Sequence, residues 1–283
     1  SGGLKEKVEA VLASSDDVAV KAACQEYLDT FNSGVTNGPA TDRLVAALEG
    51  KDCDTCKDIV KNKDFLSKKS QWIFGGDGWA YDIGFGGVDH VLASGQDINV
   101  MVFNTEVYSN TGGQASKATP TGAVAQFAAG GKEVKQKDLA GIAMSYGYVY
   151  EAQIAMGAAY NQTVKAIAEA EAYPGPSLII AYAPCINHGI KKGMSKAQTE
   201  EKLAVESGYW HLFRFNPAAD KKFVVDSKAP TKDFKEFIGG EVRYASLALK
   251  DAAKAARLQD QAAENAKERY DYLQKLQVLY GND

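Results

Sequence analysis

The chain has little of what membrane, secreted and nucleic-acid-binding proteins need. It has no apolar run of about 18 residues, the length from which a segment can begin to span a bilayer, and it has no signal-peptide pattern. Its 32 basic and 36 acidic residues give a net charge of −4, which leaves no basic excess for nucleic acid. We therefore expect a cytoplasmic protein that binds neither membranes nor nucleic acids.

Two common nucleotide-binding motifs are also missing. Gly84 and Gly86 begin a G-x-G-x-x-G pattern, but Asp89 stands where the third glycine should be. No glycine–lysine pair is followed by the serine or threonine of a phosphate-binding P-loop. At 283 residues, the chain is nevertheless long enough to bury the core of one α/β domain with extensions.

What the chain does contain is a pair of polar loops, each placed directly after a predicted buried strand. Residues 72–74 lead into a loop with Asp77 between two glycines, and residues 98–103 lead into a loop that contains Thr105. Because ligands bind at the carboxyl ends of parallel strands, we expect both loops at one edge of a sheet. Oxygen donors of this kind suit Mg²⁺, and flanking glycines let the backbone approach a phosphate. The pattern predicts a magnesium–diphosphate site, with a simple tight turn as the alternative.

The order of the predicted elements indicates a doubly wound α/β fold with a mostly parallel sheet. Apolar runs predict strands over 72–74, 98–103, 148–153 and 176–182, and helical patterns cover 81–92, a segment from Asp138, and 157–172. Polar patterns predict two to four surface helices between residues 4 and 63, and one or two long helices over 240–279. We expect three parts: a helical lead-in over 1–70, the α/β domain over 71–225, and a helical extension over 226–283.

Long segments of the chain resemble the pyruvate:ferredoxin (or flavodoxin) oxidoreductase family. The resemblance is carried by Gly76-Asp77-Gly78-Trp79 and by Thr105-Glu106-Val107-Tyr108-Ser109-Asn110, within a similar run from Trp72 to about Pro120. It continues through residues 141–147, 176–189 and 210–217. Together these segments imply the carboxyl-terminal, thiamine diphosphate-binding domain of such an enzyme.

The resemblance implies particular roles for the residues of the two loops. Mg²⁺ would be held by the carboxylate of Asp77, the hydroxyl of Thr105 and the main-chain carbonyl of Val107. Asn110 would lie beside the thiazolium ring and the substrate carboxylate as the catalytic residue, because an amide can donate to an oxyanion without adding charge. The residues expected to line the diphosphate are Gly76, Gly78, Trp79, Glu106, Tyr108 and Ser109.

Cys185 would be one of four thiolates that hold a 4Fe-4S cluster near the thiamine. Such a cluster needs four cysteine ligands, and the family's other three lie upstream of the segment that this chain resembles. The family also has, upstream, a glutamate that activates the aminopyrimidine and an arginine that binds pyruvate. We therefore expect this chain, which begins with serine and not methionine, to be the carboxyl-terminal piece of a larger enzyme and inactive alone.

The implied intact enzyme decarboxylates pyruvate oxidatively, forms acetyl-CoA and CO₂, and passes electrons through iron–sulfur clusters to ferredoxin or flavodoxin. Its partners would be the remaining domains of the same enzyme, coenzyme A, and a second copy in a homodimer. A non-redox thiamine diphosphate-dependent decarboxylase or transferase is one alternative, although it has no need for a thiolate at Cys185. An inactive folded scaffold is another.

The other cysteines have open roles. Cys53 and Cys56 form a C-x-x-C pair, a spacing that lowers a thiol pKa and can support redox chemistry. With Cys185 and His188 they could also form a split zinc site, although zinc pairs normally lie closer in sequence. Because the pair falls in a polar helical stretch, two ordinary thiols is the favoured interpretation. Cys24 is expected to be a small buried hydrophobe, and His188 a loop histidine bonded to backbone.

Overall fold

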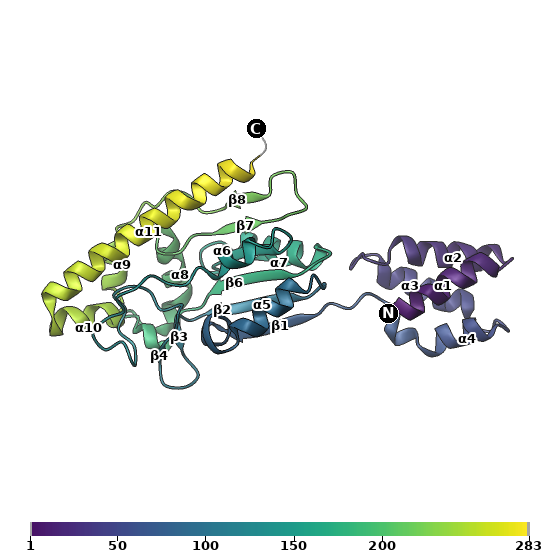
Figure 1. The fold of residues 1–283 in the computed structure, drawn as a ribbon, viewed down its shortest axis with the longest axis horizontal. Helices are drawn as coiled ribbons and strands as arrows, with labels where there is room; N and C mark the ends of the chain where they lie inside the picture. The colour runs from purple at the N-terminus through teal and green to yellow at the C-terminus, as the bar shows by residue number, and fades with distance from the viewer. Residues whose placement is uncertain (1, 282–283) are drawn as a thin grey trace. The chain divides into compact units, whose positions relative to one another are not determined.

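The computed structural model describes residues 2–281 and divides the chain into two compact units. The first ends at Gln71 and the second begins at Trp72. The first unit is helical, as predicted, and Figure 1 shows its four α-helices in purple and blue. Its elements are α1 (Gly2–Ser14), α2 (Val18–Asp29), α3 (Asn37–Leu48), α4 (Asp54–Lys61) and the short turn η1 (Lys63–Phe65).

The helical unit has a hydrophobic core of its own. Val8 of α1 and Leu44 of α3 are fully buried in it, and so is the ring of Tyr27. The Tyr27 hydroxyl donates to the carbonyl oxygen of Leu66 at 3.0 Å, which ties α2 to the end of the unit. The polar pattern had predicted surface helices, but these helices form a core of their own. Each helix contributes only a few apolar residues, and these residues meet only when the helices pack together.

The second unit is built on a six-stranded sheet in the order β1-β2-β6-β5-β7-β8. The first four strands in this order are parallel, and β7 and β8 are antiparallel, so the predicted α/β fold with a mostly parallel sheet is confirmed. Each predicted strand is present with its ends shifted by at most two residues. The strands are β1 (Trp72–Gly76), β2 (Asn99–Asn104), β5 (Tyr150–Ile154), β6 (Ser177–Tyr182), β7 (Phe213–Phe215) and β8 (Phe223–Val225).

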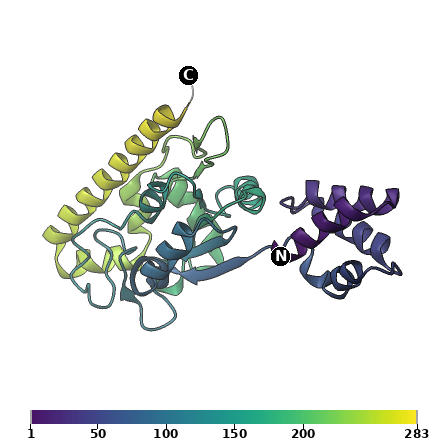
Figure 2. The same cartoon turned by 45° about the vertical axis from the view of Figure 1, so that its right-hand side comes forward.

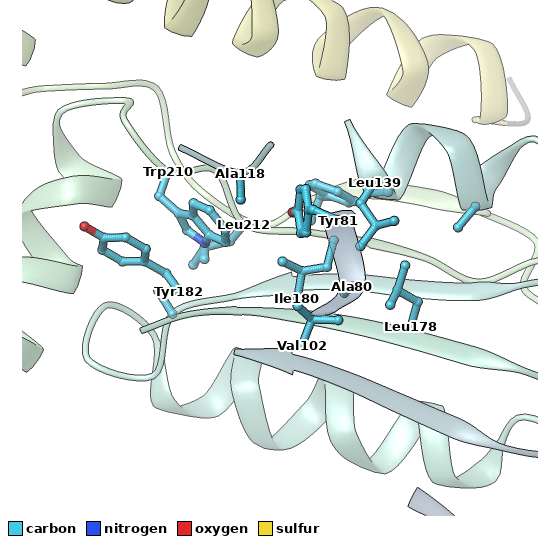
Figure 3. Close-up of a cluster of buried hydrophobic side chains, with 14 of the residues drawn as sticks. Ala80, Tyr81, Val102, Ala118, Leu139, Leu178, Ile180, Tyr182, Trp210 and Leu212 are labelled. Carbon is cyan, nitrogen blue, oxygen red and sulfur yellow. The ribbon is translucent and has the colours of Figure 1, made fainter. Parts of the chain in front are cut away.

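The sheet separates two hydrophobic layers because successive side chains along a strand point to opposite faces. On β2, Val102 enters the larger core and Met101 enters the smaller one. On β6, Ile180 and Ile179 divide in the same way. Figure 3 shows part of the larger core, where Val102 and Ile180 project from the strands toward the ring of Tyr81.

Helices cover both faces of the sheet. The smaller core is closed by α7, whose Ala166 and Ala170 are fully buried and allow close approach to the strands. The larger core receives side chains from α5, α6 and the carboxyl-terminal helices. The helices of this unit are α5 (Phe85–Ala93), α6 (Leu139–Met144), α7 (Tyr160–Ala172), α8 (Ala197–Glu206), α9 (Phe234–Gly239), α10 (Val242–Lys250) and α11 (Ala252–Tyr280).

The helix predicted over residues 81–92 is wrong at its amino-terminal end. A π-helical segment, η2 (Gly78–Ile83), comes first, and α5 begins only at Phe85. The two are separated at Gly84, where an added Cβ would lie 2.2 Å from the indole of Trp79. Packing of the Trp79 ring therefore interrupts the helix at a residue that only glycine can occupy. The helix predicted from residue 157 similarly begins later, at Tyr160.

The carboxyl-terminal region forms helices, as predicted, and the longest of them packs along the sheet. Figure 1 shows α11 in yellow beside β8, and Figure 2 shows the same helix from a second direction. The amide of Val225 donates to Gln277 Oε1 at 2.7 Å, and the rings of Phe215 and Tyr280 lie 5.2 Å apart. No helix within residues 2–281 has the length and apolar character that crossing a membrane requires.

His211, which precedes β7, gives the fold a predictable pH dependence. Its ring is 3% exposed, and burial, together with the positive charge of Arg269, lowers its pKa to about 4. In the unfolded chain this histidine binds a proton near pH 6.5. The contribution of His211 to the unfolding free energy is therefore fully present above that pH and is lost as the pH falls toward 4. We expect the unfolding free energy to fall by up to about 3 kcal/mol over this range because of His211.

Urea denaturation of the wild type and His211→Gln at several pH values measures this contribution. The variant should lose the His211 part of the slope. Identical slopes in the wild type and His211→Gln would contradict the assignment.

Candidate functional site

Three polar loops leave the sheet at neighbouring strand ends. The loop after β1 begins with Asp77, the loop after β2 contains Thr105, and the loop after β6 contains Cys185. In the ladder, Gly76 pairs with Phe103, and Asn104 pairs with Tyr182, so the carboxyl ends of these three strands lie side by side. The parallel register thus brings together segments from distant parts of the sequence.

Asp77 and Thr105 are in direct contact. The Asp77 carboxylate is fully buried, and its Oδ1 accepts hydrogen bonds from the Thr105 amide at 3.1 Å and the Thr105 hydroxyl at 2.8 Å. Its Oδ2 accepts from the hydroxyl of Ser116 at 2.6 Å. Ser116 was not predicted as a site residue. It lies within the run that carries the family resemblance, but neither its type nor its spacing singled it out.

The Thr105 hydroxyl also lies 3.0 Å from the carbonyl oxygen of Val107. It therefore has two acceptors within reach, Asp77 Oδ1 and Val107 O, but only one hydrogen to donate. A carboxylate, a hydroxyl and a main-chain carbonyl thus converge at a point where one hydrogen cannot satisfy both acceptors. All three are oxygen ligands of the kind that Mg²⁺ takes, so the residues present fit this cation.

The electrostatics of Asp77 also fit a bound cation. Burial raises the pKa of its carboxyl, and the nearby negative charge of Glu106 raises it further, although the bonds from Ser116 and Thr105 act in the opposite direction. Within the described residues, no lysine or arginine forms an ion pair with Asp77. The same residues contain no group of three or more His, Cys, Asp and Glu side chains able to hold a metal. A magnesium site here would therefore depend on one carboxylate and neutral oxygens.

The glycines around Asp77 differ in what surrounds them. A Cβ on Gly78 would lie 2.5 Å from the ring of Tyr108, and one on Gly75 would lie 2.3 Å from the Trp79 indole. By contrast, a Cβ on Gly76 would have nothing within 4 Å. Gly76 therefore has open space beside it, which Gly78 and Gly75 do not have. The Trp79 ring packs against the backbone of its own loop.

Glu106 has a different environment from the one predicted for a diphosphate-lining residue. It has a φ of 62°, and its side chain is fully buried. One carboxylate oxygen, Oε2, lies 2.7 Å from Arg243 Nη2 and accepts from the Tyr209 hydroxyl at 2.6 Å. Burial alone would raise the pKa of Glu106, but the charge of Arg243 and the proximity of His188 outweigh it and lower the pKa to about 2. The carboxylate thus belongs to a buried ion network.

This buried network, consisting of Glu106, Arg243, Glu241, Tyr209 and His188, joins three parts of the unit. The Arg243 guanidinium, on α10, also binds Glu241 at 2.7 Å and the Tyr209 hydroxyl at 2.9 Å. It thereby fixes the backbone of the loop that carries Thr105 and Val107. Sequence reasoning missed Arg243, Glu241 and Tyr209. No local pattern marks them, because each lies more than 100 residues from Glu106 in the chain.

Ser109 and Asn110 lie in the exposed turn between two short strands, β3 (Val107–Tyr108) and β4 (Gln114–Ala115). This turn contacts the Cys185 loop, since a Cβ on Gly113 would lie 2.8 Å from Asn187 Oδ1. The predicted catalytic amide of Asn110 is therefore on a segment that is exposed on one side and touches the cysteine loop on the other. Its role stays a prediction.

Cys185 begins a short turn, η3 (Ile186–His188), and is partly exposed. Its amide donates to His188 Nδ1 at 3.0 Å, and its sulfur accepts from the Asn187 amide at 3.4 Å. Burial alone would raise the pKa of the Cys185 thiol, but His188 and the Asn187 amide outweigh it and lower the pKa. His188 is fully buried, and its Nε2 lies 3.6 Å from Glu106 Oε2. These contacts make the thiolate, the form that binds metals, easier to form than in an ordinary cysteine.

The predicted site residues fall into two groups: those that converge beside Asp77, and those that lie elsewhere, such as Glu106 in the buried network and Asn110 in its exposed turn. The structure brings together Asp77, Thr105 and Val107 at one point, with Gly76 and Gly78 beside them. Residues 62–181 match the family described as thiamine pyrophosphate enzyme, C-terminal TPP binding domain. Over 95% of its length the chain is 52% identical to the pyruvate:ferredoxin oxidoreductase of Moorella thermoacetica.

The chain matches the carboxyl-terminal, thiamine diphosphate-binding part of the pyruvate:ferredoxin (flavodoxin) oxidoreductases. It is also 50% identical, over 96% of its length, to the pyruvate-flavodoxin oxidoreductase of Klebsiella pneumoniae. Over 95% of its length it is 44% identical to the NADP(+) pyruvate dehydrogenase of Euglena gracilis, which is mitochondrial. The resemblance stated from the sequence is confirmed. The chain spans about a quarter of the first two relatives, 24% of each, and 15% of the third.

Proposed function

We propose that this chain binds thiamine diphosphate and Mg²⁺ as the carboxyl-terminal part of a pyruvate:ferredoxin or pyruvate:flavodoxin oxidoreductase. The observation that carries the proposal is the convergence of Asp77 Oδ1, the Thr105 hydroxyl and the Val107 carbonyl, with Thr105 Oγ1 2.8 and 3.0 Å from the other two. These three oxygens would hold the cation. The cation would neutralise the charge of a diphosphate, for which there is open space at Gly76.

Each neighbouring residue has a separate part in this proposal. The buried Ser116 hydroxyl would hold the second Asp77 oxygen, so that the carboxylate keeps one orientation toward the cation. Gly78, by leaving room for the Tyr108 ring, would let the loop after β2 close against the loop after β1. Asn110, exposed in its turn, would donate its amide hydrogens to a substrate carboxylate or a developing oxyanion.

Bound thiamine diphosphate supplies the carbanion stabilisation that decarboxylation of a 2-oxo acid requires. In the proposed intact enzyme, pyruvate loses CO₂, coenzyme A accepts the acetyl group, and electrons leave through iron–sulfur clusters to ferredoxin or flavodoxin. Cys185 would be one of four thiolates on the nearest 4Fe-4S cluster, with the other three from the rest of the enzyme. The contact between the Asn110 turn and the Cys185 loop supports a short path between the two centres.

The proposal extends to the surroundings of this chain. The chain spans 24% of the length of its first two relatives, so the rest of the enzyme would provide the pyrimidine-binding groups. The intact protein would act as a cytoplasmic homodimer. We expect the chain by itself to bind cofactor but not to reduce a viologen dye with pyruvate and coenzyme A. Appreciable turnover by the isolated chain would show that the missing groups are dispensable.

Calorimetric titration with thiamine diphosphate, in the presence and absence of Mg²⁺, tests the binding step. The proposal expects saturable binding that requires the cation, and a complete absence of binding would favour a folded scaffold. Iron and sulfide assays on the intact enzyme separate a redox enzyme from a non-redox thiamine decarboxylase or transferase, since only the former needs the Cys185 thiolate.

The open space at Gly76 leads to a specific prediction. Gly76→Ala should leave the unfolding free energy within about 0.5 kcal/mol of wild type, because the added methyl meets nothing within 4 Å. The same methyl should weaken thiamine diphosphate binding at least about tenfold by occupying the diphosphate position. Gly78→Ala provides the contrast: its methyl would overlap the Tyr108 ring, so both stability and binding should fall. Unchanged affinity in Gly76→Ala would place the diphosphate elsewhere.

A further inference from the structure

The cysteine pair of the helical unit has a specific geometry that the proposed function does not use. Cys53 is the N-cap of α4, with extended backbone dihedrals of −134° and 125°, and Cys56 lies in the first turn of the same helix. The amide of Cys56 donates to the Cys53 sulfur at 3.3 Å. The capping role that serine or aspartate usually fills is therefore taken by a sulfur, which this amide stabilises as an anion.

The two thiols differ in exposure and in acidity. Cys53 is partly exposed, whereas Cys56 is only 4% exposed. Hydrogen bonds from the Cys56 side chain and then from its amide lower the pKa of Cys53. Burial raises the pKa of Cys56 to about 11, with further contributions from the Cys53 sulfur and from nearby Cys24. The arrangement thus places a partly exposed, more acidic thiol beside a covered, less acidic one.

We propose that Cys53 and Cys56 form a redox-active dithiol that exchanges with external disulfides, with Cys53 as the attacking sulfur and Cys56 as the resolving one. The substrate class is a disulfide of a small thiol or of another protein. The i, i+3 spacing places both cysteines on one helical turn, where the Cys56 amide lies 3.3 Å from the Cys53 sulfur. This inference is independent of thiamine and of the cation site.

The exchange proceeds in two balanced steps. The Cys53 thiolate attacks one sulfur of the external disulfide, so that a mixed disulfide forms and the first external thiolate leaves and takes up a proton. Cys56 then loses its proton and attacks the Cys53 sulfur, which forms the Cys53–Cys56 bond and releases the second external thiolate. The two cysteines are oxidised by two electrons, and the external disulfide is reduced to two thiols.

The other arrangements that the sequence left open fit less well. Within residues 2–71 no group of three or more His, Cys, Asp and Glu side chains could hold a metal, so the pair is not part of a zinc site of its own unit. Two ordinary thiols would not need one sulfur at a helix N-cap with an amide directed at it. Cys24 is fully buried, and burial raises its pKa to about 11, so it has neither the access nor the acidity of an attacking thiol.

The test uses the reduced 283-residue chain and glutathione disulfide as the probe. After reaction, free thiols are blocked with N-ethylmaleimide and the chain is digested with trypsin. The cleavage sites at Lys51 and Lys57 place Cys53 and Cys56 on one peptide, and Cys24 and Cys185 on two others. We expect the peptide of residues 52–57 to become two hydrogens lighter and to carry no maleimide.

Single substitutions then assign the roles. Cys56→Ser should stop at the mixed disulfide, with one glutathionyl group on Cys53, and Cys56→Ala repeats this measurement should the serine disturb the buried site. Cys53→Ser, which keeps a good N-cap, should make the peptide react at least about 10-fold more slowly. The matched control Cys24→Ser should behave as wild type.

Each of the other outcomes overturns the proposal. Maleimide on both cysteines after treatment of the wild type would mean that the pair does not close. A bond between Cys53 and Cys24 in the Cys56→Ser variant would mean that the resolving thiol is misassigned. Equal rates for Cys53→Ser and the wild type would mean that Cys53 is not the attacking sulfur.

Discussion

Asp77→Asn is expected to weaken the magnesium-dependent binding of thiamine diphosphate at least about 100-fold, because it removes the only carboxylate at the proposed cation site. The amide is nearly the same size, and its oxygen can still accept from Thr105. The unfolding free energy should therefore change little, or rise by about 1 kcal/mol, since a neutral group replaces a fully buried carboxylate that forms no ion pair within residues 2–281. Calorimetry for binding and urea denaturation for stability measure the two effects separately.

A matched control is available on α5. Asp89 is partly exposed and accepts from the Tyr146 hydroxyl at 2.7 Å, away from the three convergent oxygens. Asp89→Asn should leave cofactor binding at the wild-type level. If Asp77→Asn bound the cofactor as tightly as Asp89→Asn, the cation would have to be held by other residues, and the proposed site would be wrong.

Arg243→Met is expected to lower the unfolding free energy by roughly 3–5 kcal/mol, the largest stability change predicted for a single side chain of this protein. The guanidinium is 2% exposed and lies 2.7 Å from each of two buried carboxylates, Glu106 and Glu241. Methionine preserves the apolar volume but leaves both carboxylates without a cation in a buried environment. The loss comes from these unpaired charges more than from the pair's own attraction.

Two further variants show whether the buried charges are responsible. Arg257→Met removes an exposed ion pair with Glu133, whose side chains are 57% and 51% exposed, and should cost less than about 1 kcal/mol. Glu106→Gln in the Arg243→Met background should restore part of the lost stability, since one unpaired charge is gone. Additive losses in the double variant would contradict a direct coupling between the two residues.

The same network connects stability with the proposed site. Glu106 lies between Thr105 and Val107 in the sequence, and its φ of 62° is uncommon for a residue with a side chain. Its contacts with Arg243 and Tyr209 hold the backbone in that conformation. They thereby keep the Thr105 hydroxyl and the Val107 carbonyl directed at one point. Arg243→Met should therefore also weaken thiamine diphosphate binding.

Much of the site could be predicted from the sequence because its signals are local. Asp77 and Thr105 each follow a short apolar strand, and parallel strands deliver their carboxyl-end loops to one edge of a sheet. Gly84 shows where local reasoning failed. The helical spacing of residues 81–92 gave no sign that the Trp79 ring would interrupt the helix there, since that depends on packing against Gly75 and Gly84.

By itself, the sequence determined the mostly parallel α/β fold and four of its strands, and it predicted the residues placed at the proposed cation. Only the tertiary structure decided that the Glu106 carboxylate turns into a buried network and that Arg243, Tyr209 and Glu241 hold it there. The physical reason is separation along the chain: Glu106 and Tyr209 are 103 residues apart, so no periodicity or spacing relates them. A buried charge can be recognised only when burial and the position of its partner are known together.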